Sequence, residues 1–352
     1  MNPLSGLYGT GVALRNKLFD RGLLPTMRLE QPVVSVGNLS AGGTGKTPFV
    51  IALGELLKER GIRFNVLSRG YGRKTRGVLV VDPDGSTSDF GDEPRLIARK
   101  LAVPVIVGES RYQAGRVAEQ KFQTQLHLLD DGFQHRSLAR DFDVVLMASG
   151  DFEDRLLPSG RLREPLSSLE RADAIVLPQD LAVEHSCLRE KPVWRMTREI
   201  YIAGRVLTSP VLTSSVLTSP FREGTASAVP NVPPQSTGFS PAVPPSPVAF
   251  CGLARPEQFF AQVRAAGVAP SAEVIFRDHH TYDRTDIQRL LTMRRKLGAG
   301  GFLTTEKDAI NLGPLRADLE PLTIASLKLT LHRPAELIET ILARIADRKP
   351  RS

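Results

Sequence analysis

The chain has 352 residues, of which 41% are hydrophobic and 24% charged, as in a folded globular protein with room for two domains. Its formal charge of +8 favours a nucleotide or an anionic lipid surface as partner. Nucleic acid is not expected, because few aromatic residues stand among the basic stretches. No run approaches the ~18 apolar residues of a membrane-spanning helix. Cys187 and Cys251 lack metal-binding spacing, so we expect them reduced, in a cytoplasmic protein.

Residues 1–28 predict a helix with two possible roles. Apolar residues recur at helical spacing early in the segment, with Arg15, Lys17 and Arg21 among them. One interpretation is a helix packed on the core. The other is an amphipathic segment lying on an anionic membrane surface, and we predict this membrane contact for residues 1–28.

The stretch after residue 32 has the pattern of a phosphate-binding loop. The β-branched run Val33–Val36 leads into the turn Ser-Ala-Gly-Gly-Thr-Gly-Lys-Thr, and the periodic run Pro48–Arg60 predicts a helix. Glycines let backbone N–H groups converge on an anion, and the helix N-terminus adds partial positive charge. Lys46 would reach the β- and γ-phosphates, and the Thr47 hydroxyl would ligate Mg²⁺. The predicted nucleotide-binding residues are Ser40, Ala41, Gly42, Gly43, Thr44, Gly45, Lys46 and Thr47.

Strand and helix patterns continue to alternate as far as residue 200. This alternation predicts an α/β fold, with a P-loop-type parallel sheet over residues 29–200 and helices on both faces. Functional residues should then gather at the carboxyl ends of the strands. The predicted strands are Phe64–Leu67, Val78–Val81, Val105–Val107, Leu126–Leu129, Val144–Met147 and Ala174–Leu177, and the predicted helices are Pro94–Ala102 and Arg111–Phe122.

Two adjacent carboxylates, Asp130 and Asp131, follow an apolar strand pattern. Buried side by side they would repel each other unless a cation lay between them. We therefore predict that both hold Mg²⁺ together with Thr47, as strand-end carboxylates do in related nucleotide sites. The alternative is a solvated turn.

Other strand ends carry basic or acidic residues. The glycine loop Ser68–Lys74 is basic and could hold phosphate groups, and Arg111, which opens a predicted helix, could pair with an anion. Asp92 opens another helix in the sequence Gly-Asp-Glu-Pro, where an N-cap is the simplest role.

The composition changes after residue 200. Residues 201–247 carry repeats of the Leu-Thr-Ser-Pro type and many prolines, which predict an insertion or linker without packed elements. Residues 248–352 predict a smaller C-terminal α/β domain. His279 and His280 have no His or Cys partner at ligand spacing, so zinc is not expected. The predicted strands here are Val248–Leu253, Val274–Phe276, Phe302–Thr305 and Leu322–Leu331, and the predicted helices are Pro256–Ala266, Arg284–Leu297 and Pro334–Ala346.

Seven motifs, taken together, resemble the tetraacyldisaccharide 4′-kinase family, the lipid A 4′-kinases. They occur in order over about residues 30 to 310, and Ser40, which replaces the first glycine of the common loop pattern, is usual in that family. The repeat-rich segment 205–247 does not resemble the family. The motifs are GNLSAGGTGKTP (37–48), SRGYGR (68–73), GDEP (91–94), LDDGFQH (129–135), LPSGRLREP (157–165), FRDHH (276–280) and TTEKDA (304–309).

The resemblance implies ATP- and Mg²⁺-dependent phosphorylation of the 4′-hydroxyl of a tetraacyl disaccharide 1-phosphate in lipid A biosynthesis. It also implies a peripheral enzyme at the cytoplasmic face of the inner membrane, two domains that close around the nucleotide, and no protein partner. Asp92 and His279 lie in motifs that the family uses for catalysis, and we predict them as catalytic residues with Lys46 and Asp131. The predicted substrate-binding residues are Ser68, Arg69, Tyr71, Arg73, Arg111 and Asp278.

Two other functions fit the sequence less well. A partition- or metallochaperone-type NTPase switch would require a signature lysine where Ala41 stands, or an Asn-Lys-x-Asp motif, and the nearest match has Glu306 in place of Asn. A non-enzymatic membrane adaptor would leave Asp130 and Asp131 without a role.

Overall fold

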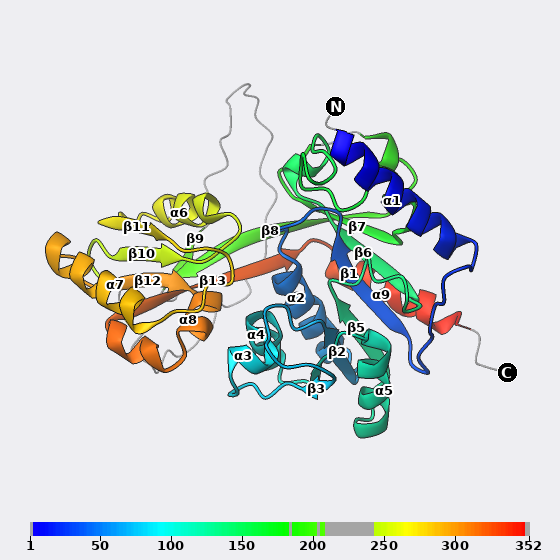
Figure 1. Ribbon diagram of the computed structural model, residues 1–352, viewed down its shortest axis with the longest axis horizontal. Coiled ribbons are helices and arrows are strands. Elements are labelled where there is room, and N and C mark those ends of the chain that lie inside the picture. The colour runs from blue at the N-terminus through cyan, green and yellow to red at the C-terminus, as the bar shows by residue number, and fades with distance from the viewer. Residues whose placement is uncertain (1–2, 183–184, 203–204, 208–242, 349–352) are drawn as a thin grey trace, which may run out of the picture.

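The computed structural model describes residues 3–182, 185–202, 205–207 and 243–348. Within this part of the chain, two α/β units lie side by side and share one sheet of 13 strands (Figure 1). Most neighbouring strands are parallel and helices cover the sheet, which confirms the predicted fold class. The strand order is β11-β10-β12-β13-β8-β7-β6-β1-β5-β2-β4-β3, and β9 pairs with β8.

The first unit is built around β1 (Val33–Asn38), which pairs in parallel with β5 (Leu126–Asp130) and β6 (Phe142–Leu146). All residues of these three strands are buried, because helices cover both faces of the sheet. The pairing sets Val36 beside Asp130, so the loop after β1 and the carboxylates after β5 meet at one edge. The other elements are α1 (Pro3–Asp20), α2 (Lys46–Glu59), β2 (Phe64–Ser68), β3 (Leu79–Val80), α3 (Thr87–Phe90), α4 (Asp92–Leu101), β4 (Val105–Val107), α5 (Arg111–Lys121), η1 (Ser149–Asp151), η2 (Leu166–Arg171), β7 (Ala174–Pro178) and η3 (Ser186–Leu188).

The second unit has its own aromatic core. The ring of Phe250 makes edge contacts with the rings of Phe276, Tyr282 and Phe302 at centroid distances of 5.8–6.4 Å. These contacts bury the apolar side chains of its strands against its helices. Its elements are β10 (Val248–Cys251), α6 (Pro256–Ala265), β11 (Ala272–Ile275), α7 (Arg284–Leu297), β12 (Phe302–Thr305), α8 (Glu306–Leu312) and η4 (Gly313–Leu319).

Two long antiparallel strands, β8 (Val193–Ile202) and β13 (Leu322–Leu331), join the units. Figure 1 shows both running from one unit to the other. The chain then ends in α9 (Pro334–Ala346), whose buried residues pack in the same core as α2 of the first unit. The predicted C-terminal range 248–352 therefore also contributes a helix to the first unit.

Two local predictions differ from the structure. The strand predicted at Val78–Val81 is only β3, which pairs antiparallel with β4 at the sheet edge and so lies outside the parallel order. Part of the segment 201–247, predicted to lack packed elements, forms strands: β8 extends to Ile202, and β9 (Arg205–Leu207) pairs antiparallel with it. Residues 203–204 and 208–242 of that segment lie outside the described residues.

The N-terminal helix α1 lies on the surface of the first unit. None of its residues is fully buried, but Tyr8, Val12 and Phe19 are half-buried, so one face of the helix packs against the first unit. Hydrogen bonds hold one face: the Tyr8 hydroxyl donates to the Arg163 carbonyl at 3.0 Å, and Asn16 Nδ2 donates to Glu164 Oε2 at 3.0 Å. Among the described residues, no helix combines the length and hydrophobicity that crossing a membrane requires.

Candidate active site

The predicted phosphate-binding loop connects β1 to α2. Gly42 and Gly45 have φ angles of 98° and 88°, a left-handed conformation that favours glycine. Gly45 is the N-cap of α2 and supplies no side-chain cap, so the N–H groups of the first turn remain available to an anion. The loop therefore has the backbone that binding of phosphate groups requires.

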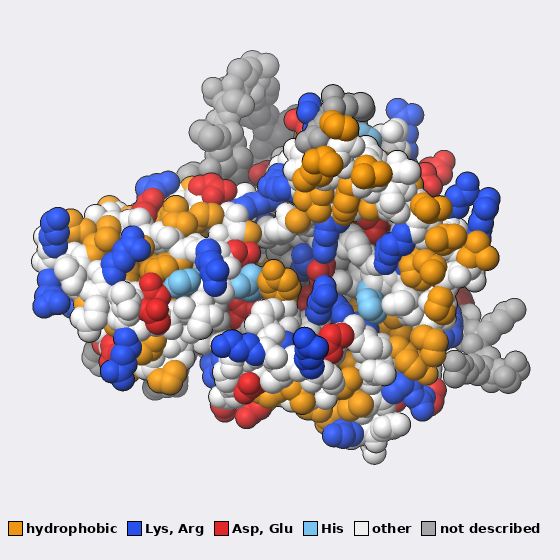
Figure 2. Space-filling view, viewed as in Figure 1, with side chains coloured by type: hydrophobic (Ala, Val, Ile, Leu, Met, Phe, Trp, Pro, Cys, Tyr) orange, Lys and Arg blue, Asp and Glu red, His pale blue; other side chains and the backbone are white. Residues whose placement is uncertain are grey.

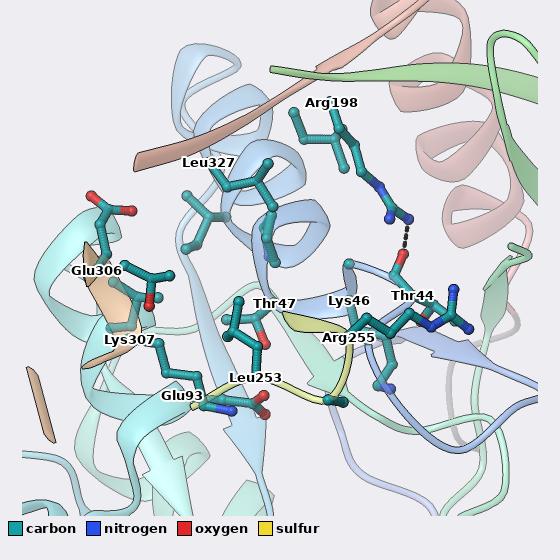
Figure 3. Close-up of a pocket in the computed structure, with 18 of the residues that line it drawn as sticks. Thr44, Lys46, Thr47, Glu93, Arg198, Leu253, Arg255, Glu306, Lys307 and Leu327 are labelled. Carbon is teal, nitrogen blue, oxygen red and sulfur yellow. Dashed lines mark hydrogen bonds between the residues drawn. The ribbon is translucent and has the colours of Figure 1, made fainter. Parts of the chain in front are cut away.

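The lysine and threonine of the loop lie beside the carboxylates after β5. Lys46 Nζ lies 3.1 Å from Asn38 Oδ1 and 3.6 Å from Asp131 Oδ1. Thr47, in the first turn of α2, is buried in the same region, and Figure 3 shows both residues at the loop. The structure thus brings together Lys46, Thr47 and Asp131, as the sequence predicted.

The linking strand and the second unit both contact this loop. Arg198 on β8 donates a hydrogen bond to the Thr44 carbonyl (Figure 3). A Cβ on Gly42 would lie 3.7 Å from the Cβ of Ala254 in the second unit. Residues of β8 and of the second unit therefore lie directly beside the loop.

The two adjacent carboxylates differ in their charge state. Burial, followed by the charges of Glu93 and Asp131, raises the pKa of Asp130 to about 7. Burial by itself would also raise the pKa of Asp131, but Lys46 and Arg163 lower it to about 2. Asp131 is therefore an anion at neutral pH, whereas Asp130 is protonated in part.

The donor set fits Mg²⁺ held jointly with a nucleotide. Asp130 accepts a hydrogen bond from Ser68 Oγ through Oδ2 at 3.0 Å, while its buried Oδ1 has no partner. Within the described residues no three His, Cys, Asp or Glu side chains cluster tightly enough to hold a metal alone. Mg²⁺ is often bound by one or two carboxylates plus phosphate oxygens and water, and Asp130, Asp131 and Thr47 offer the oxygens for such a shared site.

A histidine and an aspartate from different units meet above the loop. His279 Nδ1 lies 2.9 Å from Asp92 Oδ2 and 3.1 Å from Asp92 Oδ1. His279 stands in the turn after β11 with φ of 57°, and Asp92 opens α4. The helix N-cap is Gly91, so Asp92 does not occupy the simple N-cap position considered from the sequence. The structure places these two predicted catalytic residues in direct contact.

Two further residues, which the sequence did not single out, complete this cluster. Lys307 Nζ donates to Asp278 Oδ1 at 2.9 Å and lies 3.3 Å from His279 Nε2, and Asn311 Nδ2 donates to Asp92 Oδ2 at 3.2 Å. Burial by itself raises the pKa of Asp92, but the donors His279, Lys307 and Asn311 lower it below its ordinary value. The only sequence signal for Lys307 was its place in the motif TTEKDA.

Arg163 is another functional candidate that the sequence did not identify. Its Nη1 and Nη2 donate to the two oxygens of Asp131 at 3.1 and 2.9 Å, a two-point ion pair. It also donates to Asn38 Oδ1. The sequence signal for Arg163 was the basic motif LPSGRLREP. This motif resembles the family but does not indicate which residue Arg163 contacts.

The predicted substrate-binding residues divide into two groups. Ser68, Arg69, Tyr71 and Asp278 line a cavity of about 860 Å³ between the units. Arg73 and Arg111 are not among its lining residues. Arg73 donates to Glu109 Oε1 at 2.7 Å, while Arg111 donates to the carbonyls of Gly108 and Glu109.

The cavity has a polar and an apolar part. The loop residues Ala41–Thr47 line its polar part, with Glu93, Lys307 and His279 across from them. Apolar side chains from both units and from the linking strands line the rest, namely Ile51, Leu96, Ile200, Leu253, Phe259 and Leu327. A site with this lining suits a phosphorylated ligand that also carries an apolar group.

Comparisons with known proteins identify the family. The family model described as tetraacyldisaccharide-1-P 4′-kinase matches residues 1–346. The tetraacyldisaccharide 4′-kinase of Koribacter versatilis (strain Ellin345) is 44% identical over 356 residues, which cover 99% of this chain and 100% of the relative. That of Aquifex aeolicus (strain VF5) is 38% identical over 316 residues, covering 88% of each chain.

A solved structure agrees with these matches. The crystal structure of "apo" form LpxK from Aquifex aeolicus in complex with ATP has a TM-score of 0.71 and 32% sequence identity, and the match covers 97% of this chain and 98% of that one. The resemblance seen in the motifs is thereby confirmed along the whole chain, and the kinase prediction prevails over the NTPase-switch alternative. The chain belongs to the tetraacyldisaccharide 4′-kinase family, the ATP-dependent kinases of lipid A biosynthesis.

Proposed function

We propose that the cavity between the two units is the site at which the chain carries out the family's reaction. That reaction is phosphorylation of the 4′-hydroxyl of a tetraacyl disaccharide 1-phosphate by ATP. The observation that carries this proposal is the contact of 2.9 Å between His279 and Asp92, which pairs residues of both units beside the phosphate-binding loop. Phosphoryl transfer depends chiefly on positioning and charge neutralisation. Each of the predicted site residues has a place in that scheme.

The loop residues Ser40–Thr47 bind the phosphate groups of ATP through backbone N–H groups, and Lys46 neutralises charge on the β- and γ-phosphates. The left-handed glycines and the uncapped start of α2 support this assignment. Thr47, Asp130 and Asp131 hold Mg²⁺, directly or through water. When bound, Mg²⁺ neutralises the charge that develops on the phosphate oxygens. The buried Oδ1 of Asp130, which has no hydrogen-bond partner, supports a cation there.

The acceptor is activated by removal of its proton. The 4′-oxygen gives its proton to the Asp92–His279 pair and forms a bond to the γ-phosphorus, while the bond from that phosphorus to the β-bridging oxygen breaks and ADP leaves with the electron pair. Asp92 is only 5% exposed and, because its pKa is lowered, it is ionised at neutral pH. Such a carboxylate is ready to accept a proton.

The disaccharide lies between the loop and the second unit. Ser68, Arg69, Tyr71 and Asp278 line the cavity and contact the substrate. Arg73 and Arg111 do not line the cavity. They place positive charge near the phosphate groups without contacting the substrate directly. Closure of the second unit completes the site, because His279 and Asp278 come from that unit and Asp92 from the first.

The enzyme binds the cytoplasmic face of the inner membrane through residues 1–28. Leu7 and Leu14 of α1 are 73% and 58% exposed, and Figure 2 shows hydrophobic side chains gathered over this helix with basic ones beside them. An exposed apolar face with a basic rim is typical of helices that lie on anionic lipid surfaces. Because α1 also contacts the loop of Arg163, a membrane-bound α1 would set the site close to its lipid substrate.

The test is a transfer assay with the full chain, Mg²⁺ and ATP labelled in the γ-phosphate. Label should appear in the tetraacyl disaccharide 1-phosphate and should not appear when the 4′-hydroxyl is replaced by hydrogen. ATP hydrolysis without transfer, equal with and without the acceptor, would contradict the proposal.

A further inference from the structure

The helix α7 of the second unit has an exposed side on which every charge is positive. The helix buries Ile287 and Leu290 in the core of that unit. At about 100° per residue, the opposite side of the helix holds four basic and three neutral polar residues, all exposed, and no carboxylate. We call this side the basic face of α7; Leu297, at the end of the helix, lies outside it. Its residues are Arg284, Thr285, Gln288, Arg289, Thr292, Arg295 and Lys296.

The cations of the basic face have no structural role within the protein. Among the residues that the structure describes, none of the four pairs with a carboxylate. Arg295 reaches only the Leu291 carbonyl of its own helix, at 3.4 Å. By contrast Arg294, on another side of α7, donates to three backbone carbonyls at 2.8–3.3 Å and lies over the Phe302 ring at 5.6 Å. Arg294 therefore stabilises the unit, whereas the basic face leaves its charge to a partner.

The helix dipole does not explain this charge pattern. Cations are favoured in the last turn of a helix, which accounts for Arg295 and Lys296. Arg284, however, lies in the first turn, where a positive charge is unfavourable, and Arg289 lies in the middle. The basic face thus extends along the whole helix, and a capping box between Asp283 and Asp286 holds the start of that helix in place.

We propose that the basic face of α7 binds the surface of an anionic phospholipid bilayer, as a membrane contact of the second unit. A bilayer presents its phosphate charges as an extended surface, so it attracts cations spread along a helix rather than cations that converge on a pocket. A lipid surface is favoured over nucleic acid because the family acts on a lipid. This inference goes beyond the proposed contact through α1 and does not depend on it.

The position of α7 gives this contact a purpose. Figure 1 shows α1 and α7 at opposite ends of the molecule, one in each unit, and the cavity of about 860 Å³ is lined by residues of both units. In the same view, Figure 2 shows hydrophobic side chains over α1, and Lys and Arg side chains over the end of the second unit that carries α7. Contacts at both ends would hold the cavity close to the surface from which its lipid substrate comes.

The experiment measures binding of the full-length protein to vesicles of phosphatidylcholine, alone or mixed with phosphatidylglycerol. The variant Arg289→Gln/Arg295→Gln/Lys296→Gln should bind the anionic vesicles roughly 10- to 100-fold more weakly than wild type at low salt. The difference should shrink at high salt, because salt screens exposed charges. On neutral vesicles the two proteins should bind equally.

The matched control removes the same number of charges elsewhere. Lys121→Gln/Arg316→Gln/Arg344→Gln changes exposed cations on three separate elements, α5, η4 and α9, and should bind like wild type. The variant Arg289→Lys/Arg295→Lys should also bind like wild type, because a bilayer attracts the charge and does not need the planar fork of arginine.

Kinetics of the α7 glutamine variant show whether its fold and active site remain intact. Its ATP affinity, and its kcat with lipid substrate dispersed in neutral detergent, should equal those of wild type, because the basic face lies outside the cavity. Its KM for substrate embedded in anionic vesicles should rise, since fewer enzyme molecules reach the surface.

The outcomes test this contact separately from that of α1. A loss confined to anionic vesicles and to the α7 glutamine variant supports the proposal, even if variants of α1 bind normally. Binding equal to wild type would overturn it, and so would an equal loss in the control or a loss on neutral vesicles. Duplex DNA that displaces the wild-type protein from anionic vesicles would assign the basic face to nucleic acid and would also overturn the proposal.

Discussion

Arg163 and Asp131 form a two-point ion pair, with Nη1 to Oδ2 at 3.1 Å and Nη2 to Oδ1 at 2.9 Å. The carbonyl of the same arginine accepts the hydrogen bond of Tyr8 from α1. One residue thus links the surface helix to the carboxylate predicted to hold Mg²⁺. Because Asp131 stays ionised through this pair and Lys46, the proton in the carboxylate pair resides on Asp130.

Arg163→Lys should reduce kcat/KM by about 10- to 100-fold, the scale of losing one hydrogen bond to a charged group. Lysine keeps the charge but cannot donate in parallel to both oxygens of Asp131. The measurement is steady-state kinetics at saturating Mg²⁺. Arg161→Lys, which changes an arginine paired with Asp154 in the same loop, is the control. Equal kinetics for wild type and Arg163→Lys would mean that the pair serves only to hold the loop.

Asp130→Asn should change how stability depends on pH in the absence of nucleotide and Mg²⁺. The pKa of Asp130 is raised from 3.8 to about 7, so the native state binds this proton more tightly than the unfolded chain. The resulting stabilisation is present below about pH 4 and is lost as pH rises through about 7. The free energy of unfolding of Asp130→Asn, relative to wild type, should therefore increase from pH 4 to 7 and then level off. Urea unfolding at intervals of pH checks this, and parallel curves for the two proteins would contradict it.

Lys46→Ala should reduce turnover by at least about 10²-fold, the scale of losing one group that stabilises transferring charge. The fold should remain, because Lys46 contacts Asn38 and Asp131 at the site and not the apolar core. Turnover and the thermal unfolding midpoint are compared with those of Lys121→Ala, which changes an exposed lysine at the end of α5. A Lys46→Ala enzyme with normal turnover would contradict the nucleotide-site assignment.

The loop and the carboxylates could be predicted from the sequence because both depend on local pattern. A β-branched strand, a glycine-rich turn and a helix follow one another within residues 33–60, and β5 ends directly at Asp130. The order of β1, β5 and β2 in a parallel sheet then brings their ends to one edge. The local pattern is therefore sufficient to predict that Lys46 and Asp131 lie close together.

The connection between the units could not be predicted in this way. The strand β8 buries Trp194, Met196, Ile200 and Ile202 but breaks its alternation at Arg198, and its partner β13 lies more than 100 residues later in the chain. The contacts of Arg163 with Asp131 and of Lys307 with His279 likewise depend on tertiary packing. Sequence spacing carries no information on such pairs. The motifs that contain Arg163 and Lys307 could therefore be recognised in the sequence, but the residues that they contact could not.

The double variant Leu7→Ser/Leu14→Ser should weaken binding to anionic vesicles by about 10-fold, because it removes apolar surface that the membrane would bury. The fold should not change, since neither leucine is buried. Co-sedimentation with vesicles is measured at low and high salt. Leu297→Ser, at an exposed leucine of α7 in the second unit, is the control. Unchanged sedimentation at both salt concentrations would show that α1 does not dock on the bilayer.

The pairing of Asp92 with His279 joins the two units at the site and is the centre of the proposed mechanism. Asp92→Ala and His279→Ala should each lower kcat by roughly 10²–10⁴-fold, the scale of a lost general base. ATP binding should be little affected, because neither residue belongs to the phosphate-binding loop.

The most direct measurement is kcat for both single variants and the double variant, with ATP affinity as the control. If the two residues act as one unit, the double variant should be scarcely slower than the slower single variant. Losses that multiply in the double variant would show that Asp92 and His279 act separately, and would contradict the proposed base.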